Sequence, residues 1–116
     1  MVKGSCNFID MVNFKEKDLE KLMEFPKEGI FSKVLVKTEV SNYTLMCLAK
    51  GSGISEHTST REAAVTVLKG EGTFILKGKK IKMKPGKFIF MPKNAPHSLS
   101  ASKNLAIILS LFGKEG

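Results

Sequence analysis

From Gly29 to the end of the chain, short apolar runs alternate with turn residues. The runs are rich in Val, Ile, Phe and Thr, and several alternate apolar with polar side chains, as strands with one buried face do. "LKGKK" (76–80) predicts a tight hairpin, and "KPGK" (84–87) places Pro and Gly at the corners of a turn. The eight predicted strands are residues 32–38, 42–49, 62–69, 72–77, 79–84, 87–91, 97–101 and 104–112. This spacing predicts an all-β, antiparallel sandwich or barrel.

The residues before the first strand predict one short helix, over residues 13–25. Asn13 is a candidate N-cap, with Glu16 three residues later as in a capping box, and Pro26 is a residue at which a helix ends. The apolar residues that share one helical face are Leu19, Leu22 and Met23. We expect this helix to pack on the outside of the core.

The length of the chain, 116 residues, indicates a single domain, because two domains of half this size would each bury too little apolar surface. We expect residues 1–31 to form an N-terminal extension with the short helix. Residues 32–116 are then expected to form the barrel.

Several features predict a cytoplasmic protein that does not enter membranes. The longest apolar runs fall well short of the roughly 20 residues that a membrane span needs. The N-terminus, "MVKGSCNFID", lacks the apolar segment of a signal peptide. Cys6 and Cys47 are far apart and in no Cys-x-x-Cys arrangement, so we interpret them as two reduced thiols.

The net charge of +8 raises the question of nucleic-acid binding, but the pattern of the charges argues against it. Only one of the 19 basic residues, Arg61, is an arginine, the residue that contacts phosphates and bases with two hydrogen bonds. The densest basic run, "KGKKIKMK" (77–84), alternates lysines with apolar residues toward its end, as the solvated face of a strand does. We therefore predict no nucleic-acid partner.

Two motifs containing glycine and histidine lie in order along the predicted strands. In the first, Gly51 lies six residues before His57, and Gly70 closes the motif. In the second, "KPGKFIFMPKNAPH" joins a Pro-Gly turn to His97. Together with the strand pattern of residues 32–112, these motifs resemble those of the cupin superfamily. The resemblance implies an antiparallel jelly-roll β-barrel with the short N-terminal helix, and a homodimer.

The resemblance also implies where a metal site belongs. In the family, two histidines and an acid of the first motif and the histidine of the second bind a divalent metal. His57 matches the first ligand and His97 the last, and they are the only histidines in the chain. Ser59 stands where the second histidine belongs, and Ala63 where the acid belongs. At least two of the expected ligands are therefore missing.

Glu62 lies one residue away from the position of the missing acid. Side chains alternate across a strand, so a shift of one residue moves a group to the opposite face. The alternate positions that are uniformly apolar are Ala63, Val65 and Val67. These residues are expected to face the core, and Glu62 is then expected to point out of the barrel unless a bulge shifts it. By the resemblance, Met46 is expected to face in and Cys47 out.

Three roles stay open for His57 and His97: they hold a metal, contact a ligand without a metal, or serve a structural purpose. The other residues expected at a ligand are Ser59, Arg61, Met46 and Leu99. Arg61 also fits a turn cap or a surface pair with Glu62.

The depleted ligand set favours a protein that binds a small molecule at a degenerate two-histidine site in the barrel. The alternative is a metal-dependent enzyme, of the oxygenase or isomerase type, that acts on a small polar substrate. That alternative requires one divalent ion, Mn, Fe, Ni, Cu or Zn, bound by His57 and His97.

Overall fold

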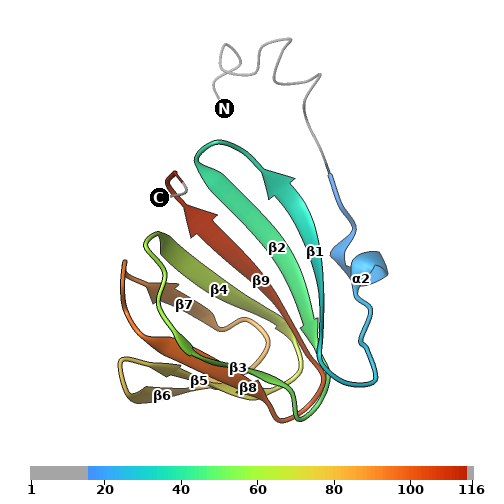
Figure 1. Ribbon diagram of the computed structural model, residues 1–116. Helices are drawn as coiled ribbons and strands as arrows, with labels where there is room; N and C mark the ends of the chain where they lie inside the picture. The colour runs from blue at the N-terminus through green and yellow to red at the C-terminus, as the bar shows by residue number, and fades with distance from the viewer. Residues whose placement is uncertain (1–15, 115–116) are drawn as a thin grey trace.

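The computed structural model describes residues 16–114, which form two antiparallel β-sheets that face each other (Figure 1). One sheet has five strands in the order β1-β2-β9-β4-β7, and the other has four in the order β3-β8-β5-β6. The strands are β1 (Ile30–Lys37), β2 (Ser41–Leu48), β3 (Gly53–His57), β4 (Glu62–Lys69), β5 (Gly72–Leu76), β6 (Lys79–Met83), β7 (Phe88–Met91), β8 (His97–Ala101) and β9 (Leu105–Phe112). This architecture is the all-β, antiparallel jelly-roll barrel that the sequence predicts.

One strand, β3, is absent from the predicted set. Its sequence, "GISEH", has a single apolar residue, Ile54, so it lacks the alternation by which strands are recognised. It forms because it pairs with β8, with a register shift between Ile54 and His57. Tertiary pairing therefore creates a strand where the local pattern is weak.

The predicted helix is much shorter than expected. Within the described part of that range, residues 16–25, the helical residues are those of α2, Leu19–Leu22, and the N-cap Asp18 makes no side-chain capping hydrogen bond. The expected cap, Asn13, lies outside the described residues. After α2 the backbone is extended at Met23, with φ −66° and ψ 129°. A helix of one turn gains little by itself, so packing decides the shape of this segment.

That packing is on the outer face of the five-stranded sheet. Leu45, Cys47 and Ala106 form a small buried cluster there, and the apolar residues that cover it from the N-terminal side are Leu22, Met23 and Phe25. Cys47 is fully buried with a free thiol. The expectation that Cys47 faces out of the barrel is confirmed, although the covering segment keeps it from solvent.

The main core lies between the two sheets. The alternation predicted for β4 is confirmed, because Ala63, Val65 and Val67 are at most 2% exposed and belong to this core. Glu62 is exposed at the start of the strand, so no bulge turns it inward. β4 thus contributes one face to this core.

Gly70, at the turn between β4 and β5, is needed for the close approach of two turns. Its φ is +92°, and a Cβ atom there would collide with the carbonyl oxygen of Asn104, in the turn before β9. Asn104 in turn accepts a hydrogen bond through Oδ1 from the Lys50 N–H, at 2.9 Å. Only glycine meets both requirements, for the backbone angle and for the space.

Within residues 16–114, the structure contains no helix with the length and apolar character needed to cross a membrane.

Candidate functional site

The pairing of β3 with β8 brings His57 and His97 together. They are partners in the strand register, and their ring centroids are 4.2 Å apart with an angle of 62° between the ring planes. Regular alternation would place His57, three residues after Ile54, on the opposite face from it. The register shift in β3 removes this difference, and both side chains line the same cavity.

Each imidazole is oriented by a backbone carbonyl two residues earlier in the chain. Nδ1 of His57 lies 2.9 Å from the carbonyl oxygen of Ser55, and Nδ1 of His97 lies 2.8 Å from that of Ala95. A carbonyl oxygen only accepts hydrogen bonds, so both Nδ1 atoms carry the proton and donate. In the neutral rings, Nε2 is then left with a lone pair on each histidine.

The two histidines differ in burial. His97 is 8% exposed, and its ring lies parallel to that of Phe74, with centroids 5.9 Å apart and 5° between the planes. His57 is exposed at the end of β3. In residues 16–114 every fully buried side-chain nitrogen and oxygen has a hydrogen-bond partner. Nε2 of His97 has no partner among these residues, so it is not fully buried and stays within reach of a small ligand.

The cavity beside the two rings is small, about 40 Å³. Apart from His57 and His97 its lining is apolar, and it includes two residues that the sequence analysis proposed, Met46 and Leu99. Cavities that enclose a whole metabolite measure about 300–1,000 Å³. This one therefore has room for a water molecule, a metal ion or the end group of a ligand.

Ser59 and Arg61 do not line this cavity. Ser59 Oγ accepts a hydrogen bond from the Arg61 N–H at 3.1 Å, and its carbonyl oxygen accepts one from the Asn94 N–H at 2.7 Å. The bond from Asn94 holds the loop before β4 against the loop that leads to His97, and the bond from Arg61 lies within the loop before β4. In residues 16–114, Arg61 forms no ion pair with Glu62. Direct ligand contacts of Ser59 and Arg61 stay predictions.

Phe74 is a site residue that sequence reasoning missed. Its inward direction in β5 follows from alternation, since its neighbours Thr73 and Ile75 are the more exposed residues. Its position against His97 depends on the pairing of β5 with β8, which the local sequence does not reveal.

The side chains at the two histidines form an incomplete set of metal ligands. No group of three His, Cys, Asp or Glu side chains in the described part of the chain is arranged to hold a metal ion. Ala63 is buried and apolar at the position of the expected acid, and Cys47 lies on the other face of its sheet. The two Nε2 atoms fit part of a coordination sphere, whereas stable protein sites use three or four ligands.

A jelly-roll barrel with two histidines from adjacent strands at an internal cavity defines a cupin-type protein. A family model described as a cupin domain matches residues 44–112. The chain belongs to this family.

The chain is similar to proteins of several bacteria. An uncharacterised protein of Aquifex aeolicus is 30% identical over 107 residues, which cover 88% of each chain. A solved protein of unknown function from Streptococcus pyogenes is 27% identical, with a TM-score of 0.79, over 88% of this chain and 90% of that one. A cupin 2 conserved barrel domain protein from Leptotrichia buccalis is 32% identical, with a TM-score of 0.75, over 80% of this chain and 45% of that one.

Proposed function

We propose that this chain is a binding protein whose site is the His57–His97 pair, and that the pair accepts hydrogen bonds from the end group of a small ligand. The observation that carries the proposal is the orientation of both rings. Each Nδ1 donates to a backbone carbonyl, so the two Nε2 atoms are left as neighbouring acceptors.

The cavity limits what this ligand is. Apart from the two imidazoles its walls are apolar, and its volume of about 40 Å³ admits a single small group. An amine, with more than one N–H, donates hydrogen bonds to both Nε2 atoms, and a hydroxyl, with a single O–H, donates to one of them. The rest of the ligand lies outside, on the exposed side of His57. A hydroxyl or amine on a small organic molecule is therefore the chemistry that we propose.

A metal-dependent enzyme is the second candidate, and the same ring orientation favours it. Histidines that bind metals usually donate their other N–H to a carbonyl or carboxylate, as both rings do here. One divalent ion, Mn, Fe, Ni, Cu or Zn, would be held by the Nε2 atoms of His57 and His97. A bound ion would act as a Lewis acid toward water or a small polar substrate. In this candidate the two side chains fix the position of the ion, and the apolar walls restrict water.

The experiment that separates the two candidates uses untagged protein, first treated with a chelator and then offered each metal before desalting. Wild type, His57→Ala and His97→Ala are compared by elemental analysis. Near one equivalent of metal, lost in both variants, supports the enzyme candidate. Metal below about a tenth of an equivalent removes it, because a working metal site must be occupied.

The metal-free protein is then screened against small alcohols and amines by thermal shift. Stabilisation that is lost in both histidine variants supports the binding proposal. Absence of any stabilisation, together with absence of metal, contradicts both candidates and leaves the histidines a structural role.

The homodimer that the family resemblance implies is also a proposal. Closed two-fold dimers are the commonest assemblies of soluble proteins. Light scattering during size-exclusion chromatography is expected to give the mass of two chains. The mass of one chain would contradict this.

A further inference from the structure

A second hollow lies away from the histidines, on the open side of the barrel between β6 and β7. These two strands are the last strands of their sheets, so neither has a partner on this side. The groove has a volume of about 510 Å³ and shares no lining residue with the histidine cavity. This volume is in the range of sites that bind small molecules.

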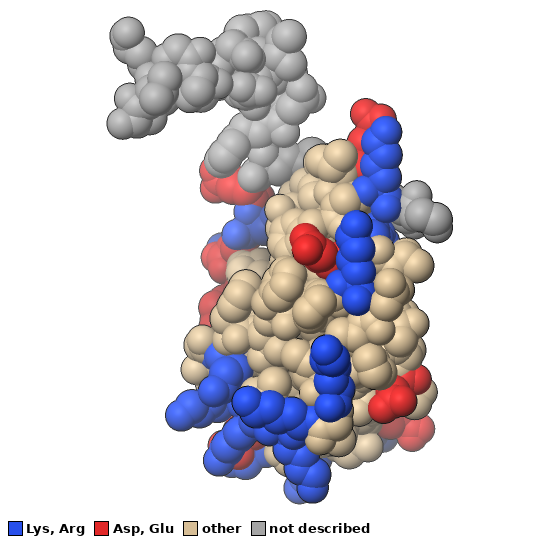
Figure 2. Space-filling model, turned by 90° about the vertical axis from the view of Figure 1, so that its left-hand side faces the viewer, with Lys and Arg blue, Asp and Glu red and all other residues tan. Residues whose placement is uncertain are grey.

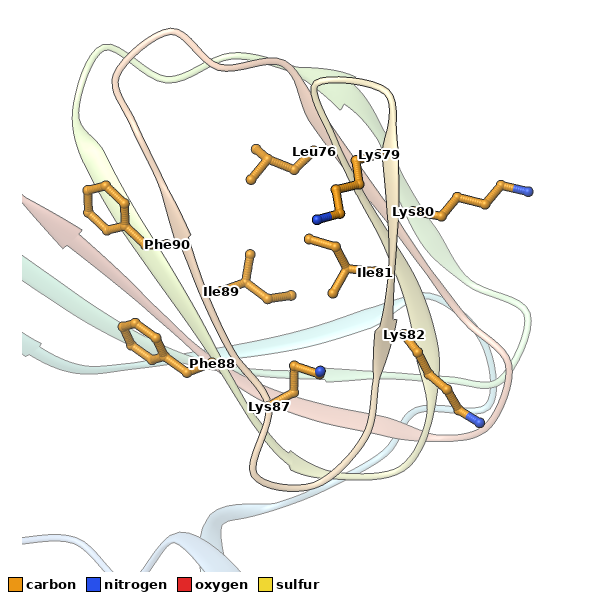
Figure 3. Close-up of a pocket in the computed structure, with 9 residues that line it drawn as sticks. All are labelled: Leu76, Lys79, Lys80, Ile81, Lys82, Lys87, Phe88, Ile89 and Phe90. Carbon is orange, nitrogen blue, oxygen red and sulfur yellow. The ribbon is translucent and has the colours of Figure 1, made fainter.

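The groove has an apolar floor. Leu76, Ile81 and Ile89 come from β5, β6 and β7, and their side chains point into the gap between the two edges (Figure 3). Ile89 is 4% exposed and belongs to the main core, so the floor is anchored in packed structure. The apolar body of a ligand would remove this floor from water.

Lysines surround the floor, and no acidic residue lines the groove. They are Lys79, Lys80, Lys82 and Lys87. In residues 16–114 none of them takes part in an ion pair. Figure 2 shows that lysine side chains gather at the lower end of the face on which the β5–β6 hairpin lies. The electrostatic potential of this region therefore attracts anions.

Two of the four lysines are directed differently from the others. Lys79 and Lys87 extend their ammonium groups toward the gap, whereas Lys80 and Lys82 extend away from it (Figure 3). Alternation explains the difference: Lys79 shares its side of β6 with Ile81, and Lys87 lies two residues before the inward-facing Ile89. A lysine that points inward at an open sheet edge also prevents the edge from pairing with another strand. A binding experiment is therefore needed to separate this role from ligand binding.

We propose that this groove is a binding site for an amphipathic carboxylate. Its apolar body lies on Leu76, Ile81 and Ile89, and its carboxylate pairs with the ammonium groups of Lys79 and Lys87. The proposal is independent of the histidine site, because a ligand in the groove touches neither ring.

The experiment is an NMR titration of the full chain, labelled with ¹⁵N, with octanoate and with octan-1-ol. The expected result is that octanoate shifts the amide signals of β6 and of residues 87–90, and that the uncharged alcohol binds at least about tenfold more weakly, since the charged hydrogen bonds are lost. Signals around His57 and His97 are expected to stay unchanged.

Two double variants with the same change in net charge provide the matched control. Lys79→Gln with Lys87→Gln is expected to weaken octanoate binding at least about tenfold. Lys80→Gln with Lys82→Gln is expected to change it less than about twofold, because screened charges that point into water contribute little. Equal weakening by both pairs, equal binding of the alcohol, or no shifts in β6 and β7 would overturn the proposal.

Discussion

The ring of His97 lies parallel to that of Phe74, with centroids 5.9 Å apart and 5° between the ring planes. Phe74 is fully buried, so it forms a fixed wall that holds His97 in place. The hydrogen bond from His97 Nδ1 to the Ala95 carbonyl fixes the rotation of the same ring. The orientation of the buried half of the site is therefore set by packing and by one hydrogen bond.

Removal of this wall is expected to destabilise the protein. Phe74→Ala should lower the free energy of unfolding by about 3–5 kcal/mol, because it leaves a cavity in the core. Phe88→Ala is the control, since Phe88 is 63% exposed and its loss should cost about 0.5 kcal/mol or less. Urea denaturation measures both. Similar losses for the two variants would contradict the packing described here.

Glu62 is expected to take no part in binding at the two histidines, because it is exposed on the outer face of β4. Glu62→Gln should therefore leave the binding of metal or ligand unchanged, whereas His97→Ala should abolish it. The same metal and thermal-shift measurements check this. Weakening by Glu62→Gln as large as that by His97→Ala would show that the carboxylate reaches the site.

Ser59 is expected to position a loop. Ser59→Ala removes the acceptor of the Arg61 N–H and should lower the free energy of unfolding by about 0.5–1.5 kcal/mol. Binding at the histidines should persist in this variant. If binding were lost while the free energy of unfolding stayed the same, the hydroxyl would contact the ligand directly.

Gly70 and Gly86 provide a matched pair, because both have φ near +90°. Gly86 has open space around it, so Gly86→Ala should cost only the backbone strain of about 1–2 kcal/mol. Gly70→Ala adds a collision with the Asn104 carbonyl and should cost at least about 1 kcal/mol more. Thermal denaturation followed by circular dichroism compares them. Equal costs would contradict the close approach of the two turns.

The thiol of Cys47 is expected to react slowly in the native protein, because the segment with Leu22, Met23 and Phe25 covers it. Replacing these three residues by alanine should accelerate alkylation of Cys47 by iodoacetamide, on the order of tenfold, by favouring local opening. Peptide mass spectrometry distinguishes Cys47 from Cys6. Val34→Ala, at an exposed site on β1, is the control. An unchanged rate in the triple variant would show that other residues protect the thiol.

The alternation of side chains made much of the barrel predictable. The strong strands, the inward direction of Ala63 and the outward direction of Glu62 all follow from a period of two residues. The helix was predicted less well, since α2 has four residues. The apolar residues at its end and after it, Leu22, Met23 and Phe25, pack against the five-stranded sheet. Local propensity is a weak guide where one turn of helix competes with tertiary contacts.

The sequence by itself determined that the chain is a β-barrel of the cupin type with two histidines and without the family's full set of metal ligands. The strands follow from local alternation and turn residues, and the cupin type and the missing ligands follow from the resemblance of the two motifs to those of the family. Only the tertiary structure showed how His57 comes to face the cavity, through a register shift in β3 that opposes regular alternation. It also decided that Phe74 supports His97 and that Lys79 and Lys87 face one groove. These relations join strands far apart in sequence, and the pairing that creates them is a property of the whole sheet.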